Sequence, residues 1–261
     1  MKIFALGVRF CPWFAGLMLS GFAAYAQMPG GAGPAGMSAA LTKLFGTTTA
    51  FAAKGEMQVT DAAHNEVAFW PMDFAILDRR IRVKIDLAET RNKDMPPGTG
   101  ATLKKIGMSE VVSIIRPDKK VLYVIYPDQR VMLAMPLPKE DYEGSDKAPQ
   151  VSKTPLGKEI IDGHPCVKNR VLISDSAGQT AEAITWDATD LKNLPIQIET
   201  QEKDPTSPQG NTTSLVRFKQ IQFARPDAAL FEPPSGYTQY NNAEDLKLGV
   251  MKKMMDSAAK K

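Results

Sequence analysis

Apolar and polar residues alternate along most of the chain, and this two-residue period predicts a protein built mainly from β-strands. The clearest run is 81–87, where Ile81, Val83 and Ile85 alternate with charged residues, so one face of the strand meets a core and the other meets water. About ten extended runs of this kind stand against two or three short helical segments. The sequence therefore predicts a mainly β (α+β) fold.

Turn signals join neighbouring runs into hairpins. An Asp-Gly pair at 162–163 separates the extended runs 157–161 and 166–173, and such a pair is a strong short-range signal of a tight hairpin. The following run, 180–199, returns through a corner and completes an antiparallel meander, whose apolar face needs a cover. The charged, turn-rich segment 139–152 divides the strands into two groups.

Two segments depart from the strand period. Residues 88–104 are polar and contain a Pro-Pro-Gly turn, which predicts a long surface loop. From Ala243 onward, Leu246, Val250 and Met254 recur at helical spacing, which predicts a C-terminal helical tail over 241–261. We expect this tail to pack against the domain, or to make a peripheral contact with a membrane.

The first 26 residues have the features of a cleaved secretory signal peptide. A basic start precedes an apolar core and a small-x-small cleavage signal at 24–26. We therefore expect a periplasmic or secreted protein. The Gly- and Pro-rich residues 27–37 predict a flexible leader. Residues 38–240 predict a single β-rich domain, which begins with a short helix at 38–45.

The charge balance argues against nucleic-acid binding. Loss of residues 1–26 removes Lys2 and Arg9 from the 32 basic residues, which leaves 30 against 29 acidic ones. A chain this close to neutral lacks the basic surface that nucleic acids require. Of the 2 cysteines only Cys166 remains, so no intramolecular disulfide is possible and the fold must rest on its own core.

Few residue patterns suggest catalysis. The sequence has no Gly-x-Ser-x-Gly, no phosphate-binding loop and no paired-His zinc helix. His164 and Cys166, with Asp162 nearby, would need further partners to bind a metal or to act as a nucleophile and base. Asp187 and Asp190 are better explained as a strand end and a turn cap than as a carboxylate pair. We predict no catalytic residue, no metal, no cofactor and no enzymatic activity.

Three stretches of the sequence follow a recognisable order. They are Gly157-x-Glu159-x-Ile161-x-Gly163-x-Pro165-Cys166, then Trp186-x-Ala188-x-Asp190-Leu191-x-x-Leu194-Pro195, then Asp227-Ala228-x-Leu230-Phe231-x-Pro233-Pro234-x-Gly236-Tyr237. This pattern, which spans most of 51–240, resembles a bacterial family of exported domains of unknown function, similar in fold to the LolA/LolB-like lipoprotein carriers. The resemblance implies a curved antiparallel sheet, or incomplete β-barrel, with a few short helices covering its open side and an apolar concave face that holds acyl chains.

The resemblance and the alternating strands together predict a non-enzymatic periplasmic binding protein that carries or senses a lipid, an acyl chain or a lipidated protein. Its partner would be that hydrophobic ligand or lipoprotein, and the protein itself a monomer. The side chains expected to contact the ligand on the concave face are Ile81, Val83, Ile85, Leu122, Val124 and Trp186. An alternative is an envelope structural or interaction protein whose concave face is filled by its own side chains.

Overall fold

The computed structural model describes residues 44–259 except 94, 138, 140–141, 143–149, 175–179 and 203–210. The expected signal peptide (1–26), the leader (27–37) and all but the last two residues of the helix expected at 38–45 lie outside the described residues. Among the helices of the described part of the chain, none is both long enough and apolar enough to cross a membrane.

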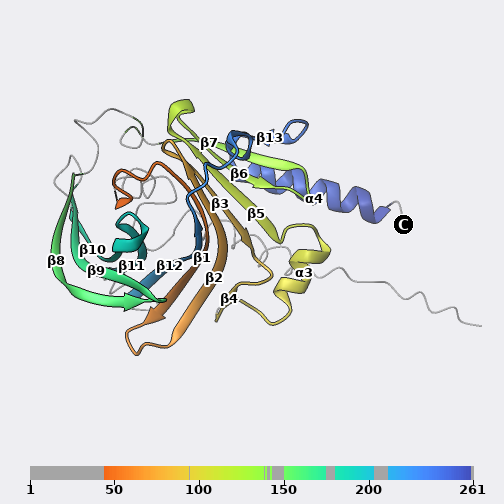
Figure 1. The fold of residues 1–261 in the computed structure, drawn as a ribbon. Helices are drawn as coiled ribbons and strands as arrows, with labels where there is room; N and C mark the ends of the chain where they lie inside the picture. The colour runs from red at the N-terminus through yellow and green to blue at the C-terminus, as the bar shows by residue number, and fades with distance from the viewer. Residues whose placement is uncertain are drawn as a thin grey trace, which may run out of the picture.

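One sheet of 13 strands forms the body of the protein (Figure 1). The strands are β1 (Ala50–Asp61), β2 (Glu66–Leu77), β3 (Arg80–Asp86), β4 (Arg91–Asn92), β5 (Glu110–Arg116), β6 (Val121–Tyr126), β7 (Val131–Pro136), β8 (Gln150–Ile161), β9 (His164–Ser174), β10 (Thr180–Ala188), β11 (Leu194–Glu202), β12 (Thr212–Gln222) and β13 (Thr238–Tyr240). Their order is β13-β7-β6-β5-β3-β2-β1-β12-β11-β10-β9-β8, with β4 beside β2. Only the short pairing of β13 with β7 is parallel in the described sheet.

The sheet consists of two antiparallel meanders that meet in its middle. The first contains β1 to β7 and the second contains β8 to β12, with residues 137–149 between them in the chain. Strand β12 pairs with β1 along most of its length, from Asp61↔Thr212 to Ala52↔Gln222. The division into two strand groups that the sequence indicates is therefore a division within one continuous sheet.

The hairpin between β8 and β9 turns at the predicted Asp-Gly pair. Asp162 has φ 51° and Gly163 has φ 87°, so both residues lie in the left-handed region. A two-residue type I′ turn needs positive φ at both central positions, and its twist matches that of the flanking strands. Asp tolerates this region and Gly adopts it freely, which explains why these two residues form this hairpin.

Alternating side chains make one face of the sheet an apolar core, which we call the inner face. Buried side chains from both meanders meet there in a single cluster, as the concave side of a strongly curved sheet allows (Figure 1). We call this cluster the floor; it contains Leu44, Phe45, Phe51, Ala53, Phe74, Ile76, Ile81, Ile115, Leu122, Leu137, Val171, Ala183, Leu194, Ile198 and Phe218.

Four phenylalanine rings occupy the centre of the floor, where β1, β2 and β12 lie side by side. The rings of Phe45, Phe51, Phe74 and Phe218 have centroids 5.0–6.1 Å apart in mostly tilted or edge-to-face arrangements. Aromatic pairs in these geometries contribute about 0.5–1.5 kcal/mol each beyond the burial of their area. This ring cluster therefore fixes the junction between the two meanders.

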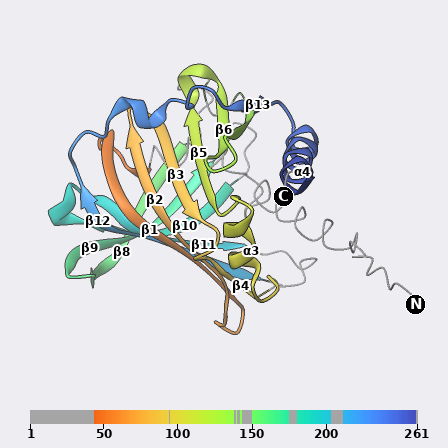
Figure 2. The same cartoon turned by 90° about the vertical axis from the view of Figure 1, so that its right-hand side faces the viewer.

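The chain after β12 crosses the outer face of the first meander. A 3-10 helix at Ala228–Phe231 brings Phe231, which is fully buried, against Leu77, Ile114 and Ile125 of the outer face. Figure 2 shows this segment passing over β2, β3 and β5 on its way from β12 to β13. The outer face of the first meander is thus covered by the protein's own C-terminal segment.

Two α-helices lie beside the first meander. Helix α3 (Thr99–Lys105) occupies part of the segment 88–104 that we expected to be a loop, and β4 occupies another part. Helix α4 (Ala243–Ala259) places Leu246 and Val250 against β6 and β7. Since the partly buried Val124 and Met135 contact both this cluster and the floor, α4 packs on the same side of the sheet as the floor.

The fold class predicted from the sequence is confirmed. The protein is mainly β, with a large, open, curved antiparallel sheet and two described α-helices. The curvature produces a concave apolar side.

Candidate functional site

The inner face combines the buried floor with apolar side chains that remain partly exposed around it. These partly exposed residues pack against the floor from both meanders and include Val83, Val124, Met135, Val151, Ile173, Val216 and Ile221. An apolar ligand lying on them would displace water without needing a polar partner for each contact. The inner face is therefore the candidate site for a hydrophobic ligand.

Five of the six residues predicted to contact a ligand lie on the inner face. Ile81 and Leu122 are 1% and 3% exposed and belong to the floor, whereas Val83 and Val124 remain partly exposed beside it. Ile85 pairs with Met72 and Val111 in the register that places Ile81 and Val83 on this face, and it is buried. Val83 and Val124 are thus the predicted residues that a ligand can reach most directly.

Trp186 lies on the other side of the sheet from these residues, so its predicted position on the concave face is wrong. It packs with Cys166, Ala188 and Ile196, while its neighbour Thr185, whose side chain points to the opposite face, pairs with Ile198 of the floor. The indole Nε1 donates to Glu159 Oε2 at 2.7 Å. This bond, followed by that of Lys168, lowers the pKa of Glu159.

Polar side chains interrupt the apolar inner face where β8, β9 and β10 run together. We call Lys153, Asn169, Thr185 and Asp187 the inner polar cluster. Asn169 pairs with Thr185 across the two strands, and Val171, two residues further along β9, belongs to the floor. This cluster was not predicted from the sequence. The available signal was that the polar Asn169 lies two residues from the apolar Val171, so both side chains point to the same face of β9.

The carboxylate of Asp187 is the centre of this cluster. Its Oδ2 accepts hydrogen bonds from Lys153 Nζ at 2.8 Å and from Asn169 Nδ2 at 3.0 Å. Lys153 Nζ also lies 3.4 Å from the carbonyl oxygen of Leu44, within hydrogen-bond reach. Buried polar groups of this kind are tolerated because they pair with one another.

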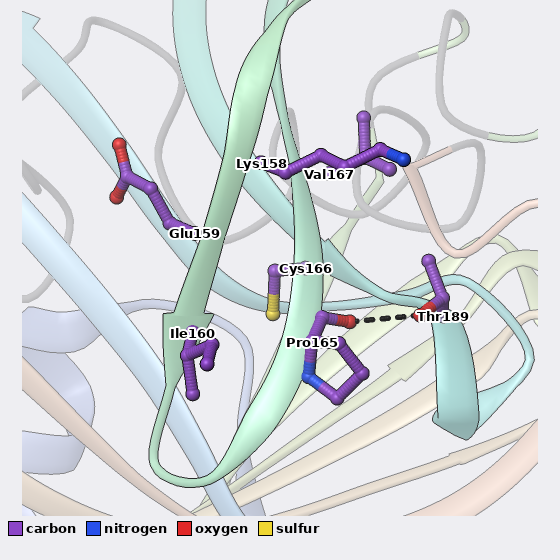
Figure 3. A pocket seen from close by; sticks show the side chains of 7 residues that line it. All are labelled: Lys158, Glu159, Ile160, Pro165, Cys166, Val167 and Thr189. Atoms are coloured by element: carbon purple, nitrogen blue, oxygen red, sulfur yellow. Dashed lines mark hydrogen bonds between the residues drawn. The ribbon is translucent and has the colours of Figure 1, made fainter.

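A separate hollow of about 370 Å³ lies at the β8–β9 hairpin (Figure 3). Its lining mixes apolar and charged groups: Lys158, Glu159, Ile160, Pro165, Cys166, Val167 and Thr189. Thr189 Oγ1 donates to the carbonyl oxygen of Pro165 at 3.0 Å, which ties the 3-10 helix Thr189–Leu191 to β9 (Figure 3). None of the residues predicted to contact a ligand lines this hollow.

The groups considered for catalysis are engaged in structural roles. Cys166 is 2% exposed, its Sγ donates to the carbonyl oxygen of His164, and burial raises the pKa of its thiol. The His164 ring pairs with Asp190 at 2.8 Å, and Asp187 lies in the inner polar cluster instead of joining Asp190. Within the described residues, no group of three or more His, Cys, Asp and Glu side chains is arranged to hold a metal ion.

Arg116 is a structural residue that was not singled out from the sequence. Its guanidinium, 4% exposed, forms a two-point contact with Asp118 at 2.8 and 2.7 Å, and it donates to the carbonyl oxygen of Phe231 at 2.9 Å. It also pairs with Glu232 at 2.5 Å. These contacts raise the pKa of Arg116 and attach the segment around Phe231 to β5.

Comparison with solved structures finds matches at low sequence identity. A LolA superfamily protein from Nitrosomonas europaea matches at 10% identity, covering 76% of this chain and 97% of that one, with a TM-score of 0.35. The lipoprotein LppX of Mycobacterium tuberculosis matches at 12% identity over 71% and 95% of the two chains, with a TM-score of 0.35. A DUF1329 family protein from Desulfovibrio piger matches at 9% over 76% and 96%, with a TM-score of 0.24.

The first of these solved structures is a LolA superfamily protein, which is the fold type that the resemblance in the sequence implied. No protein-family model matches the chain, and no curated protein matches it. At these identities and TM-scores the similarities do not indicate what this chain binds.

Proposed function

We propose that the protein is an exported, non-enzymatic binding protein that holds a lipid, an acyl chain or the acylated part of a lipoprotein against its inner face. The observation that supports this proposal is the apolar surface of that face, to which both meanders contribute. Its floor is buried, and apolar side chains from both meanders remain partly exposed around it. The features of residues 1–26 support export to the periplasm.

The affinity expected of such a face comes from apolar burial. Each methylene group removed from water contributes about 0.8 kcal/mol. Burial of half of a twelve-carbon chain therefore provides about 5 kcal/mol before the entropic costs of association. Because apolar contact has no preferred direction, the face suits acyl chains of different lengths.

A second candidate function is favoured by the phenylalanine rings. Phe45, Phe51, Phe74 and Phe218 fill the middle of the inner face with the protein's own side chains. An envelope interaction protein would have such a filled core and would bind its partner elsewhere. The two functions differ in whether an added apolar chain reduces the exposure of Val83 and Val124.

Native and denaturing mass spectrometry of protein purified gently from an envelope fraction tests the proposal. A stoichiometric acyl-bearing ligand that leaves on denaturation is the expected result. Uptake of a fluorescent fatty acid by the Val83→Asp variant should fall at least tenfold, because the new carboxylate lies in the ligand's path. Lys84→Gln, on the opposite face of β3, should leave uptake unchanged. Bare protein that takes up neither a fluorescent fatty acid nor an apolar probe without a head group would refute the proposal and favour the interaction protein.

A further inference from the structure

The inner polar cluster has hydrogen-bonding capacity that the described protein groups do not use. Asp187 Oδ1 and Thr185 Oγ1 are buried, and neither has a hydrogen-bond partner among the residues that the structure describes. Thr185 is 0% exposed, and the side chain of Asp187 is 9% exposed. A buried polar atom without a partner costs about 1–3 kcal/mol, so a fold retains one mainly where something else pairs with it.

Both unpaired atoms belong to the same side of β10 as the floor. Thr185 pairs with Asn169 on one side and with Ile198 of the floor on the other. Asp187 follows two residues later, so its side chain lies on the same face, as its bond to Asn169 confirms. The unused acceptor and hydroxyl are therefore on the inner face, next to apolar residues.

The cluster adjoins the partly exposed part of the inner face. Lys153, which donates to Asp187, keeps 30% of its side chain exposed, so this edge of the cluster reaches solvent. Val151 and Ile173, a cross-strand pair on β8 and β9, are partly exposed and pack against the floor. Val151 lies two residues before Lys153 on the same strand. An apolar chain attached to a polar group at the cluster would thus lie on these apolar side chains.

We propose that the inner polar cluster is the head-group site for an amphiphile whose head donates hydrogen bonds, a hydroxyl or an ammonium, and whose chain lies on the inner face. This inference rests on the proposed function and specifies its ligand class. Asp187 Oδ1 accepts from the head group, and Thr185 Oγ1 exchanges a second hydrogen bond with it. Lys153 and Asn169 hold the carboxylate in place through its other oxygen.

The same geometry disfavours a free fatty acid as the preferred ligand. A carboxylate head has no proton to donate, and it would face the carboxylate of Asp187 across a short distance. Lys153 does not offset this repulsion fully, because its ammonium is already bonded to Asp187. The site therefore distinguishes donor heads from acceptor heads on chains of equal length.

Displacement of 1,6-diphenylhexatriene, an apolar probe without a head group, tests this inference on the purified chain. The competitors are 1-dodecanol, dodecylamine, dodecanoate and dodecyltrimethylammonium, each below its critical micelle concentration. The two donor heads should bind about three- to tenfold more tightly than the other two, which is the range expected of one hydrogen bond. Dodecyltrimethylammonium separates hydrogen bonding from charge, since it is cationic but has no proton to donate.

Thr185→Val supplies the matched variant. It should reduce the affinity for 1-dodecanol, which then keeps only its bond to Asp187 Oδ1, without weakening the binding of the probe. It should leave the free energy of unfolding equal or higher, because it removes a buried hydroxyl that has no partner among the described residues. Thr180→Val, an exposed position on the opposite face of β10, should change neither quantity.

Two results would overturn the inference. Equal affinity for all four competitors, in both the native protein and Thr185→Val, would mean that Asp187 Oδ1 and Thr185 Oγ1 form hydrogen bonds with water only. The proposed binding function would then stand without the head-group site. Failure of the probe and of every competitor to bind would reject the head-group site together with the proposed function.

Discussion

Replacing Arg116 by methionine removes the charged centre of the contact that attaches the C-terminal segment to the outer face. Methionine has a similar length and keeps the aliphatic packing, so the change mainly deletes the guanidinium. The lost contacts are the two-point bond to Asp118, the bond to the carbonyl oxygen of Phe231 and the ion pair with Glu232. Lys119 also pairs with Glu232, and this exposed pair provides a control.

The size of the loss in free energy of unfolding depends on whether each former partner of Arg116 can form a hydrogen bond with water instead. The side chains of Asp118 and Glu232 are 54% and 45% exposed, so both carboxylates are rehydrated and each loss amounts to about 1 kcal/mol or less. The carbonyl oxygen of Phe231 is buried, and leaving it unpaired costs about 1–3 kcal/mol. We therefore expect Arg116→Met to lower the free energy of unfolding by about 2–4 kcal/mol. Lys119→Met should lower it by less than about 1 kcal/mol.

The loss should depend on pH in a defined direction. The bond from Arg116 lowers the pKa of Asp118, and bonds from Lys119 and then Arg116 lower that of Glu232. A carboxyl whose pKa is depressed by folding contributes stability above its unfolded pKa of about 4, and this stability is lost as the pH falls through the folded pKa. The difference between the native protein and Arg116→Met should therefore shrink as the pH is lowered from about 6 to about 3.

Urea denaturation followed by tryptophan fluorescence and circular dichroism measures these free energies. The midpoint should shift without a change in slope, because the surface exposed on unfolding is the same. A loss below 1 kcal/mol at neutral pH, or a loss as large for Lys119→Met, would refute the view that Arg116 anchors the segment. A loss that grows in acid would contradict the assigned role of the carboxylates.

Three further predictions concern the core. Phe218→Ala should lower the free energy of unfolding by about 3–5 kcal/mol in the same urea assay, because it empties the centre of the ring cluster. The thiol of Cys166 should react with a disulfide reagent only at the rate of unfolding, and fast labelling of the native protein would contradict its burial. Gly249→Ala should loosen α4, measured as faster hydrogen exchange, because a Cβ there would lie 1.9 Å from the Tyr240 hydroxyl; Gly157→Ala, with open space around it, should not.

Features of the fold that depend on neighbouring residues were predictable from the sequence. The alternation in 81–87 corresponds to β3, with Ile81 and Ile85 buried on the inner face. The Asp-Gly pair forms the tight turn between β8 and β9, because the positive φ that it requires is a local property. Helix α3 was missed because it is short, has no buried residue and begins after a glycine that provides no side-chain cap.

The position of Trp186 was not predictable, because alternation separates two faces without showing which one is inner. On β10 the usual pattern is reversed: Thr185 and Asp187 occupy inner positions and the large apolar Trp186 an outer one. A register shift between Trp186 and Asp187 adds to the difficulty. A place where sequence patterning fails is often a functional place, and here it coincides with the inner polar cluster.

The role of Arg116 depended on contacts between distant parts of the chain. Its partner Phe231 lies 115 residues away, and nothing near Arg116 in the sequence indicates this. The local sign was weaker: an arginine ends an apolar strand and is followed two residues later by Asp118, an arrangement that also suits an ordinary turn.

The pairing of β1 with β12 has a consequence for how the protein folds. Its partners lie 151 to 170 positions apart, from Asp61↔Thr212 to Ala52↔Gln222, whereas the strands of each meander are neighbours in the chain. Loop-closure entropy makes such distant contacts slow to form, so the meanders are expected to form first and to dock later. Until β12 arrives, the edge of β1 and half of the phenylalanine cluster's contacts stay open to other chains. Aggregation should therefore compete with correct folding most strongly at this single late step.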